Sequence, residues 1–179
     1  MCAAALALAG GALAPRARAD AIPVESAEVR IEDGEVVLTA LFALSVNATL
    51  EEALQRGVPL YFVLEVDIVR PRWWWFDEKV AQSSVQYRVS WQPLTRQYRV
   101  ASGLLSQSFE SLAEVERLIG RVNARTIARA EDLERGARHD ALVRLRLDVN
   151  QLPKPFQVNA LASRDWQLAS EQRRIPFTP

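Results

Sequence analysis

The stretch "PLYFVLEVDIVRP", residues 59–71, decides the fold class of this chain. Between its two prolines, apolar side chains recur at every second position, namely at Leu60, Phe62, Leu64, Val66 and Ile68. Successive side chains of a β-strand point to opposite faces, so an alternation with a period of two is typical of a strand that buries one face. The stretch therefore predicts a β-strand packed against a second layer of the protein.

Further strands are predicted on both sides of this stretch. Residues 24–46 divide at Asp33-Gly34, a pair favoured in hairpin turns, and their second half is apolar on both faces, as in a central strand. Residues 84–102 alternate around Pro93 and predict a second hairpin. The same alternation predicts a strand at "ALVRLRLDV", residues 141–149, and weaker patterns predict closing strands at "QVNALAS", residues 157–163, and "WQLASEQRRIPF", residues 166–177.

Two short helices are predicted between these strands. The first lies in "NATLEEALQRGVP", residues 47–59, where Thr49 and Glu52 have the spacing of a capping box. Ser111 and Glu114 repeat that spacing at the start of the second helix. Its apolar stripe indicates core packing and comprises Leu112, Val115, Leu118, Ile119 and Val122. The polar region that follows is predicted to be helical around residues 127–133.

Several strands joined mostly by turns favour a mainly β fold. We predict an antiparallel β-sandwich, immunoglobulin-like in general architecture, with two short inserted helices. No repeat and no linker divides the chain, so residues 20–179 are expected to form a single β-sandwich domain.

The N-terminal residues resemble a secretory signal peptide. An apolar stretch to Ala14 is followed by Pro15 and by the small-x-small site Ala17-Arg18-Ala19. We expect residues 1–19 to be removed before Asp20, which places the chain in the periplasm without a transmembrane segment. No basic residue precedes Ala14, so a start upstream of the given methionine stays open.

The composition excludes several chemistries. The formal net charge is zero, which disfavours binding to a phosphate backbone, so no nucleic-acid partner is expected. The chain has one cysteine, Cys2 in the predicted signal peptide, and one histidine, His139, which is expected to be solvated. A Cys/His metal site or nucleophile pair cannot be built from these residues, and no glycine-rich phosphate loop occurs. We therefore expect no metal, no cofactor and no enzymatic activity.

Three of the five tryptophans, Trp73, Trp74 and Trp75, are consecutive in "RPRWWWF", residues 70–76. Exposing all three rings would create a larger apolar patch than soluble monomers tolerate. If the run is extended, Trp73 and Trp75 share one face, and we predict that they pack inward while Trp74 is partly exposed beside Arg72. These four residues are the candidate binding site for a partner, a glycan or the membrane surface. A loop over the sandwich edge, with a structural role only, is the alternative.

Several motifs together resemble an uncharacterised family. The carriers of the resemblance are "VRPRWWWFDEKVA", "YRVSWQPLTRQYRV", "SFESLAEV", "RLRLDVNQLPKPFQVNA" and "DWQLASE". This family comprises exported proteobacterial proteins sometimes labelled proline-rich signal-peptide proteins and classed as domain of unknown function 4390. The resemblance implies export and an envelope signalling context, with a membrane sensor kinase as a candidate partner. It implies no reaction.

The functional expectation is a periplasmic, non-enzymatic interaction or sensory accessory module of the cell envelope, with an envelope protein as its partner. Contact with a membrane surface stays open. The alternative is a carbohydrate-binding or glycan-active protein that stacks sugars on tryptophan. Glycoside hydrolysis needs only two placed carboxylates, and those nearest the tryptophans are Asp67, Asp77 and Glu78.

Overall fold

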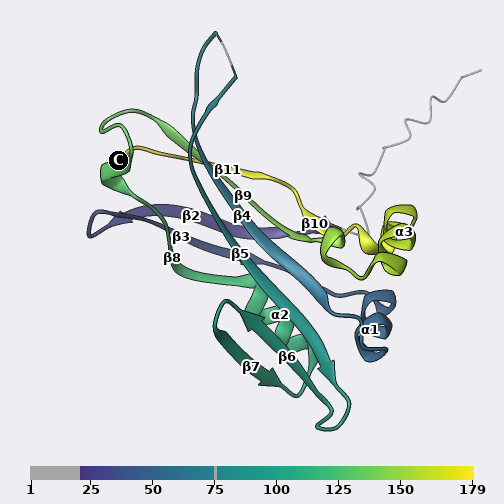
Figure 1. The fold of residues 1–179 in the computed structure, drawn as a ribbon. Helices are drawn as coiled ribbons and strands as arrows, with labels where there is room; N and C mark the ends of the chain where they lie inside the picture. The colour runs from purple at the N-terminus through teal and green to yellow at the C-terminus, as the bar shows by residue number, and fades with distance from the viewer. Residues whose placement is uncertain (1–20, 75) are drawn as a thin grey trace, which may run out of the picture.

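The structure, a computed structural model, describes residues 21–74 and 76–179, and this part of the chain is mainly β (Figure 1). The strands are β1 (Ala21–Ile22), β2 (Val24–Glu32), β3 (Glu35–Phe42), β4 (Leu60–Arg70), β5 (Glu78–Gln92), β6 (Gln97–Ser102), β7 (Leu105–Phe109), β8 (Arg121–Arg129), β9 (His139–Leu147), β10 (Ala169–Ser170) and β11 (Arg173–Phe177). The α-helices are α1 (Ala48–Gln55), α2 (Leu112–Gly120) and α3 (Lys154–Ala162). Short 3-10 helices lie at η1 (Ala130–Asp132), η2 (Val149–Gln151) and η3 (Arg164–Trp166).

The strands form two sheets in a sandwich-like arrangement, as predicted. The larger sheet has the order β1-β10-β9-β4-β5-β6-β7, and β11 also pairs with β9. The smaller sheet has the order β2-β3-β8. The pairings are antiparallel except for β1 with β10, which run parallel.

The predicted alternation in β4 builds the core. The inward side chains of β4 are buried, and they are Leu60, Phe62, Leu64, Val66 and Ile68. They lie beside inward residues of the neighbouring strands, such as Val89 of β5 and Leu145 of β9. Each fully buried aliphatic or aromatic side chain contributes about 1.5 to 3 kcal/mol relative to exposure.

Both predicted hairpins are confirmed. Asp33 and Gly34, with φ values of 51° and 82°, turn β2 into β3, and β3 is the central strand of its sheet. The turn at 93–96 connects β5 to β6.

The helices confirm one predicted cap and correct another. Ser111 and Glu114 form the capping box of α2. The cap of α1 is Asn47, whose side chain accepts from the backbone of Leu50, so the Thr49–Glu52 box was the wrong assignment. The hydroxyl of Thr49 instead donates to Asp165, 3.1 Å away.

A third helix, α3, replaces the strand predicted at 157–163. Pro155 lies in its first turn, where a missing N–H costs no hydrogen bond, so the prolines that suggested a broken chain are compatible with a helix start. The helix predicted around 127–133 is also wrong, because these residues complete β8 and then form η1. The closing segment 166–177 does contain strands, β10 and β11.

Candidate functional site at the tip of the β4–β5 hairpin

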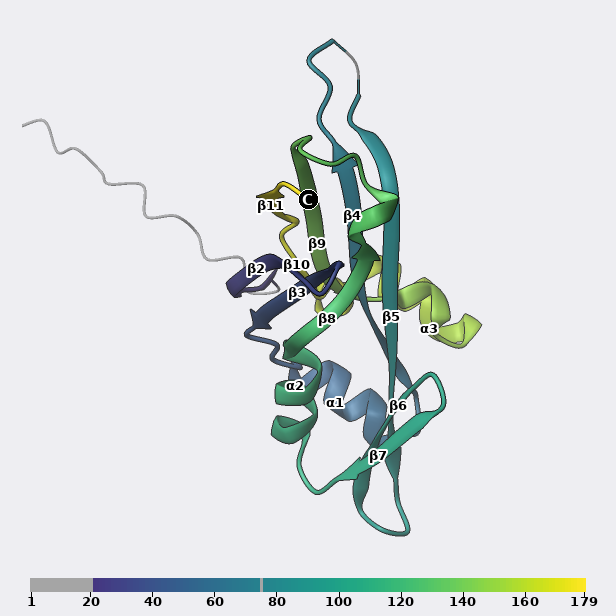
Figure 2. The ribbon, with the colours of Figure 1, turned by 90° about the vertical axis from the view of Figure 1, so that its left-hand side faces the viewer.

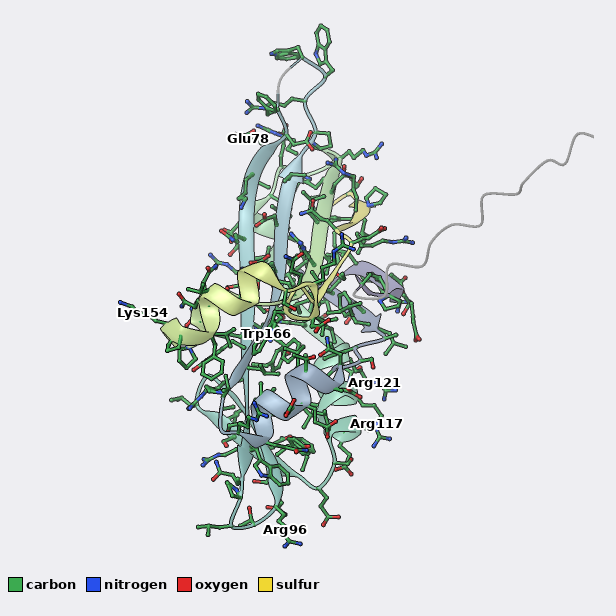
Figure 3. The ribbon with its side chains drawn as sticks, turned by 90° about the vertical axis from the view of Figure 1, so that its right-hand side faces the viewer. Glu78, Arg96, Arg117, Arg121, Lys154 and Trp166 are labelled. Atoms are coloured by element: carbon green, nitrogen blue, oxygen red, sulfur yellow. The ribbon has the colours of Figure 1, made fainter. Side chains whose placement is uncertain are left out.

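Strands β4 and β5 form a long hairpin whose connecting loop, residues 71–77, projects beyond the rest of the sandwich (Figures 1 and 2). Pro71 follows β4 directly and has no N–H for a further ladder bond, so the sheet ends there. Figure 3 shows Glu78 at the base of this loop and Arg96 at the opposite end of the molecule. We call Arg72, Trp73, Trp74 and Phe76 the aromatic tip.

The aromatic tip is exposed. Trp73 is 89% exposed, Trp74 is 64% exposed and Phe76 is 86% exposed. The rings of Trp73 and Trp74 contact each other edge-on, with centroids 4.7 Å apart and planes at 79°. The tip therefore presents two crossed indole rings and not one flat platform.

This geometry corrects one prediction for the tryptophans. Trp74 is partly exposed as predicted, but Trp73 does not pack inward. The reason is that the loop leaves the sheet, so the strict two-residue alternation of a strand does not apply to it. The prediction for Trp75 falls outside the described residues.

Ion pairs hold the base of the tip together. The carboxylate of Glu78 accepts from Arg70 at 2.5 Å and also pairs with Arg72, and Arg70 reaches Glu134 as well. Hydrogen bonds from Arg70 and then from Arg72 hold the pKa of Glu78 below its ordinary value. The predicted binding residue Arg72 is thus engaged by Glu78, with its side chain 38% exposed.

A second group of ion pairs joins the loop to β9 and β11. Arg174 of β11 bridges Asp77 of the loop, at 2.8 Å, and the buried Asp140 of β9, at 2.7 Å. The hydrogen bonds to Asp77 and then to Asp140 raise the pKa of Arg174. The loop is therefore tied to the C-terminal strand as well as to its own hairpin.

His139, expected to be solvated, is 1% exposed, which corrects that prediction. It begins β9 opposite Phe177 of β11, and the two rings lie 5.8 Å apart. Its Nδ1 lies 3.0 Å from the carbonyl of Ala137. Strand β11, at the C-terminal end of the chain, covers His139. Because β11 is distant in sequence, the residues around His139 do not indicate this contact.

The carboxylates considered for glycoside hydrolysis are all in ion pairs. Asp67 pairs with Lys79 at 2.9 Å, while Asp77 and Glu78 belong to the groups described above. A general acid must hold its proton near neutral pH, and the lowered pKa of Glu78 keeps that group ionised. Glu78 therefore suits a structural ion pair better than proton donation.

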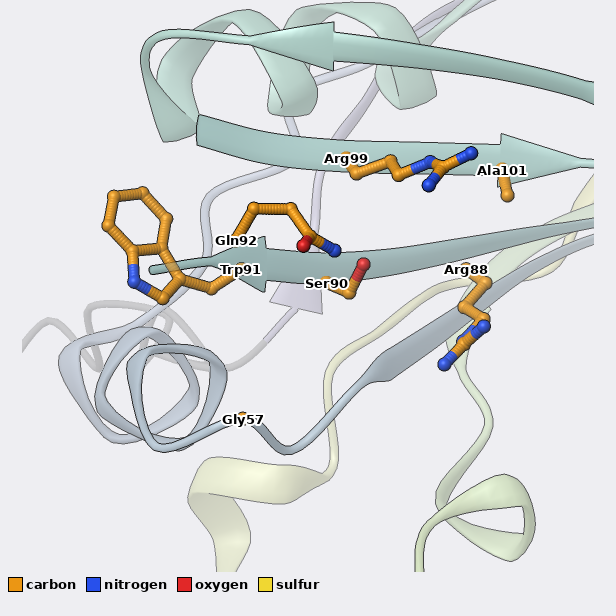
Figure 4. Close-up of a pocket in the computed structure, with 7 residues that line it drawn as sticks. All are labelled: Gly57, Arg88, Ser90, Trp91, Gln92, Arg99 and Ala101. Atoms are coloured by element: carbon orange, nitrogen blue, oxygen red, sulfur yellow. The ribbon is translucent and has the colours of Figure 1, made fainter. Parts of the chain in front are cut away.

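A second surface was missed by sequence reasoning. On the outer face of the larger sheet, a pocket of about 390 Å³ is lined by Trp91 and by polar residues of β5 and β6 (Figure 4). The polar lining includes Arg88, Ser90, Gln92 and Arg99. The alternation of β5 indicated that Arg88 and Ser90 face outward, but only the pairing with β6 brings Arg99 beside them.

Two further observations concern the described residues as a whole. None of the helices within 21–74 and 76–179 is long and apolar enough to cross a membrane. In the same residues, no group of three or more histidine, cysteine, aspartate and glutamate side chains is arranged to hold a metal ion. The predicted signal peptide, residues 1–19, and its cleavage site before Asp20 lie outside the described residues.

Comparison with known proteins gives one match. No curated protein and no solved structure is similar enough to this chain to be matched with it. Residues 19–176 match the family described as "Domain of unknown function (DUF4390)". Because the match covers nearly the whole sequence, this chain belongs to that family.

Proposed function

We propose that this chain is a non-enzymatic interaction module of the cell envelope, located in the periplasm, that docks on a protein partner through its aromatic tip. The observation that carries the proposal is the exposure of Trp73 and Phe76, at 89% and 86%, on a loop that projects from the sandwich. Large aromatic side chains in water lose the free energy that burial would supply, so a partner that covers them gains it. The periplasmic location rests on the sequence of residues 1–19.

The charges around the tip favour a protein partner over an anionic lipid surface. Arg70, Arg72 and Arg174 are each paired with a carboxylate, so the base of the tip has cations and anions in balance. Attraction to anionic lipid needs a net positive patch. Tryptophan and arginine surrounded by a polar rim are instead the composition of a protein-binding hot spot. A membrane sensor kinase is one candidate for that partner.

A second candidate function is carbohydrate binding, supported by the outer-face pocket. The donors of Arg88, Ser90 and Gln92 line it, and sugars are bound through such polar groups. The ring of Trp91 itself packs against the buried Tyr98, with ring centroids 4.7 Å apart. This site lies on the sheet and not at the tip, so the two functions can be separated by mutation.

Site-specific photocrosslinking in cells tests the first candidate. A benzophenone amino acid replaces Phe76 in one strain and Leu94, fully exposed in the β5–β6 turn, in a control strain. We expect one dominant adduct with an envelope protein from position 76 and none from position 94. The adduct should disappear when Trp73→Ser and Trp74→Ser are added.

Other outcomes would contradict docking on a protein. Identical adducts from both positions, or an adduct that survives the double substitution, would remove the role of the tip. Cosedimentation of the purified protein with phosphatidylglycerol–phosphatidylethanolamine vesicles, lost in the double variant, would assign the tip to the membrane. Binding of cell-wall glycan that is lost in Arg88→Ala and kept in Trp73→Ser would favour the second candidate.

A further inference from the structure

A separate cavity of about 240 Å³ is lined by residues of both sheets and of α2. The lining comes from β5, β6 and β7 of the larger sheet, from α2 and from β8 of the smaller sheet. Figure 2 shows β6, β7 and α2 at the end of the molecule away from the aromatic tip. Its lining residues are Val85, Tyr87, Val100, Ser102, Leu105, Ser106, Gln107, Leu118 and Arg125. We call this cavity the inner pocket.

The floor of the inner pocket is apolar. Val85 and Val100 are buried on β5 and β6, and they belong to the core. Leu105 and Leu118 stand at the entrance, with 75% and 37% of their surface exposed. An aliphatic group that entered between these two leucines would be removed from water on several sides.

One cation lines this apolar cavity. The Nε of Arg125 is buried and makes no hydrogen bond, and no carboxylate among residues 21–74 and 76–179 forms an ion pair with this arginine. Arg70, Arg146 and Arg174, by contrast, are each held by one or more carboxylates. Removing a guanidinium group partly from water without a paired anion is unfavourable. The side chain of Arg125 is therefore suited to bind an anionic ligand.

The backbone of β8 is irregular next to Arg125. Ala124 has a φ of 41°, in the left-handed region that residues other than glycine rarely adopt. The β3–β8 register shifts at the same place, because Leu38 is opposite Arg125 while Ala40 is opposite Val122. Such bulges re-aim the next side chain and recur beside functional sites, which accounts for an arginine at a cavity lined by both sheets.

Tyr87 adds a neutral donor near the cation. Burial raises the pKa of its phenol, and the charge of Arg125 opposes that shift. The phenol therefore keeps its proton at neutral pH and can donate to an anion, while Ser102 and Gln107 also line the cavity.

We propose that the inner pocket binds a small amphipathic monocarboxylate, with the carboxylate on Arg125 and the aliphatic chain against Val85, Val100 and Leu118. A carboxylate fits because the Nε–H and a terminal N–H of a guanidinium form a fork that binds its two oxygens. A single cation neutralises one negative charge, and the volume accommodates a short chain. This site is independent of the aromatic tip and of the proposed function.

Titration of the purified protein with octanoate, followed by amide chemical shifts, tests the proposal. We expect saturable binding at roughly millimolar concentration, typical for a ligand of this size, with shifts confined to β5–β8 and α2. Arg125→Met should weaken binding by about tenfold or more, because it removes a charge-assisted pair while keeping an apolar chain. Arg121→Met, at an exposed arginine of the same strand, is the matched control and should bind as the wild type does.

A second variant keeps the test valid if Arg125→Met folds poorly. Leu118→Glu places a carboxylate at the entrance, on a half-exposed position of α2, where it would compete for Arg125 and reduce octanoate binding with the fold intact. Octan-1-ol, which lacks the charge, should bind about tenfold more weakly than octanoate. Absence of octanoate binding to the wild type, or equal binding by wild type, Arg125→Met and Leu118→Glu, would overturn the proposal.

Discussion

The body and the tip of the β4–β5 hairpin use apolar residues in opposite ways. In the body of the hairpin, Phe62 and Val89 are completely buried against the second layer. A loop of seven residues, 71–77, reverses this pattern, because it carries Trp73 and Phe76 into solvent.

The difference follows from what lies opposite each part. The smaller sheet, α1 and α2 lie over one face of β4 and β5, while the loop passes beyond them (Figure 2). Apolar side chains in the body therefore stabilise the fold, and those in the tip are available to another molecule. The substitutions below test this division, from the largest expected effect to the smallest.

Phe62→Ala is expected to have the largest effect on stability. It removes a fully buried ring from the hydrophobic core, and truncations of this kind cost about 3 to 5 kcal/mol of unfolding free energy. Urea denaturation monitored by circular dichroism measures the loss. A variant with an unchanged midpoint would show that the body of the hairpin is not the core.

Asp140→Asn should have an intermediate effect. Asp140 is buried and accepts from Arg174 at 2.7 Å, so replacing the carboxylate weakens the connection between β9 and β11. We expect a loss of about 1 to 3 kcal/mol in the same denaturation experiment. Asp132→Asn, in an exposed pair with Arg129, is the control and should change stability by less than about 0.5 kcal/mol.

Trp73→Ser and Trp74→Ser should leave stability nearly unchanged. Both rings are mostly in solvent, so each substitution is expected to change the unfolding free energy by no more than about 0.5 kcal/mol. Partner binding should nevertheless be lost. A loss of several kcal/mol at Trp73 would return the tryptophan run to a structural role.

The smallest effect is expected from lowering the pH, which breaks the ion pairs of Glu78 at the base of the tip. The pKa of Glu78 is lowered by its hydrogen bonds to Arg70 and Arg72, so these bonds are fully present above the ordinary glutamate pKa of about 4.3. They are lost as the pH falls through the lowered pKa of the folded state. The fluorescence of the tryptophans in the tip should change at pH values below the ordinary glutamate pKa of about 4.3. Glu78→Gln should remove the step, and a step that persists in this variant would assign it to another group.

Local patterns predicted the body of this protein better than its tip. The alternation around Phe62 and the Asp33-Gly34 turn are local signals, and both elements formed as expected. The run at Trp73 has no such signal, because its exposure depends on where the opposite layer ends. Pro155 was ambiguous for a related reason, since a proline breaks a helix or begins one according to its neighbours.

The inner pocket shows what a sequence cannot indicate. Nothing in the residues around Arg125 distinguishes it from the many other arginines of this chain. Its position depends on a bulge opposite β3 and on strands β5 to β7, which are distant in sequence. The outer-face arginines Arg88 and Arg99 likewise come together only through strand pairing.

The central claim is that the aromatic tip binds a protein partner and does not stabilise the fold. The most direct measurement is the size of the species that contains this protein in gently solubilised envelopes, determined by sedimentation through a density gradient. The account predicts that the wild type sediments in a larger complex and that the folded Trp73→Ser/Trp74→Ser variant sediments as the free chain. Cosedimentation of the wild type and the double variant at the same position in the gradient would contradict it.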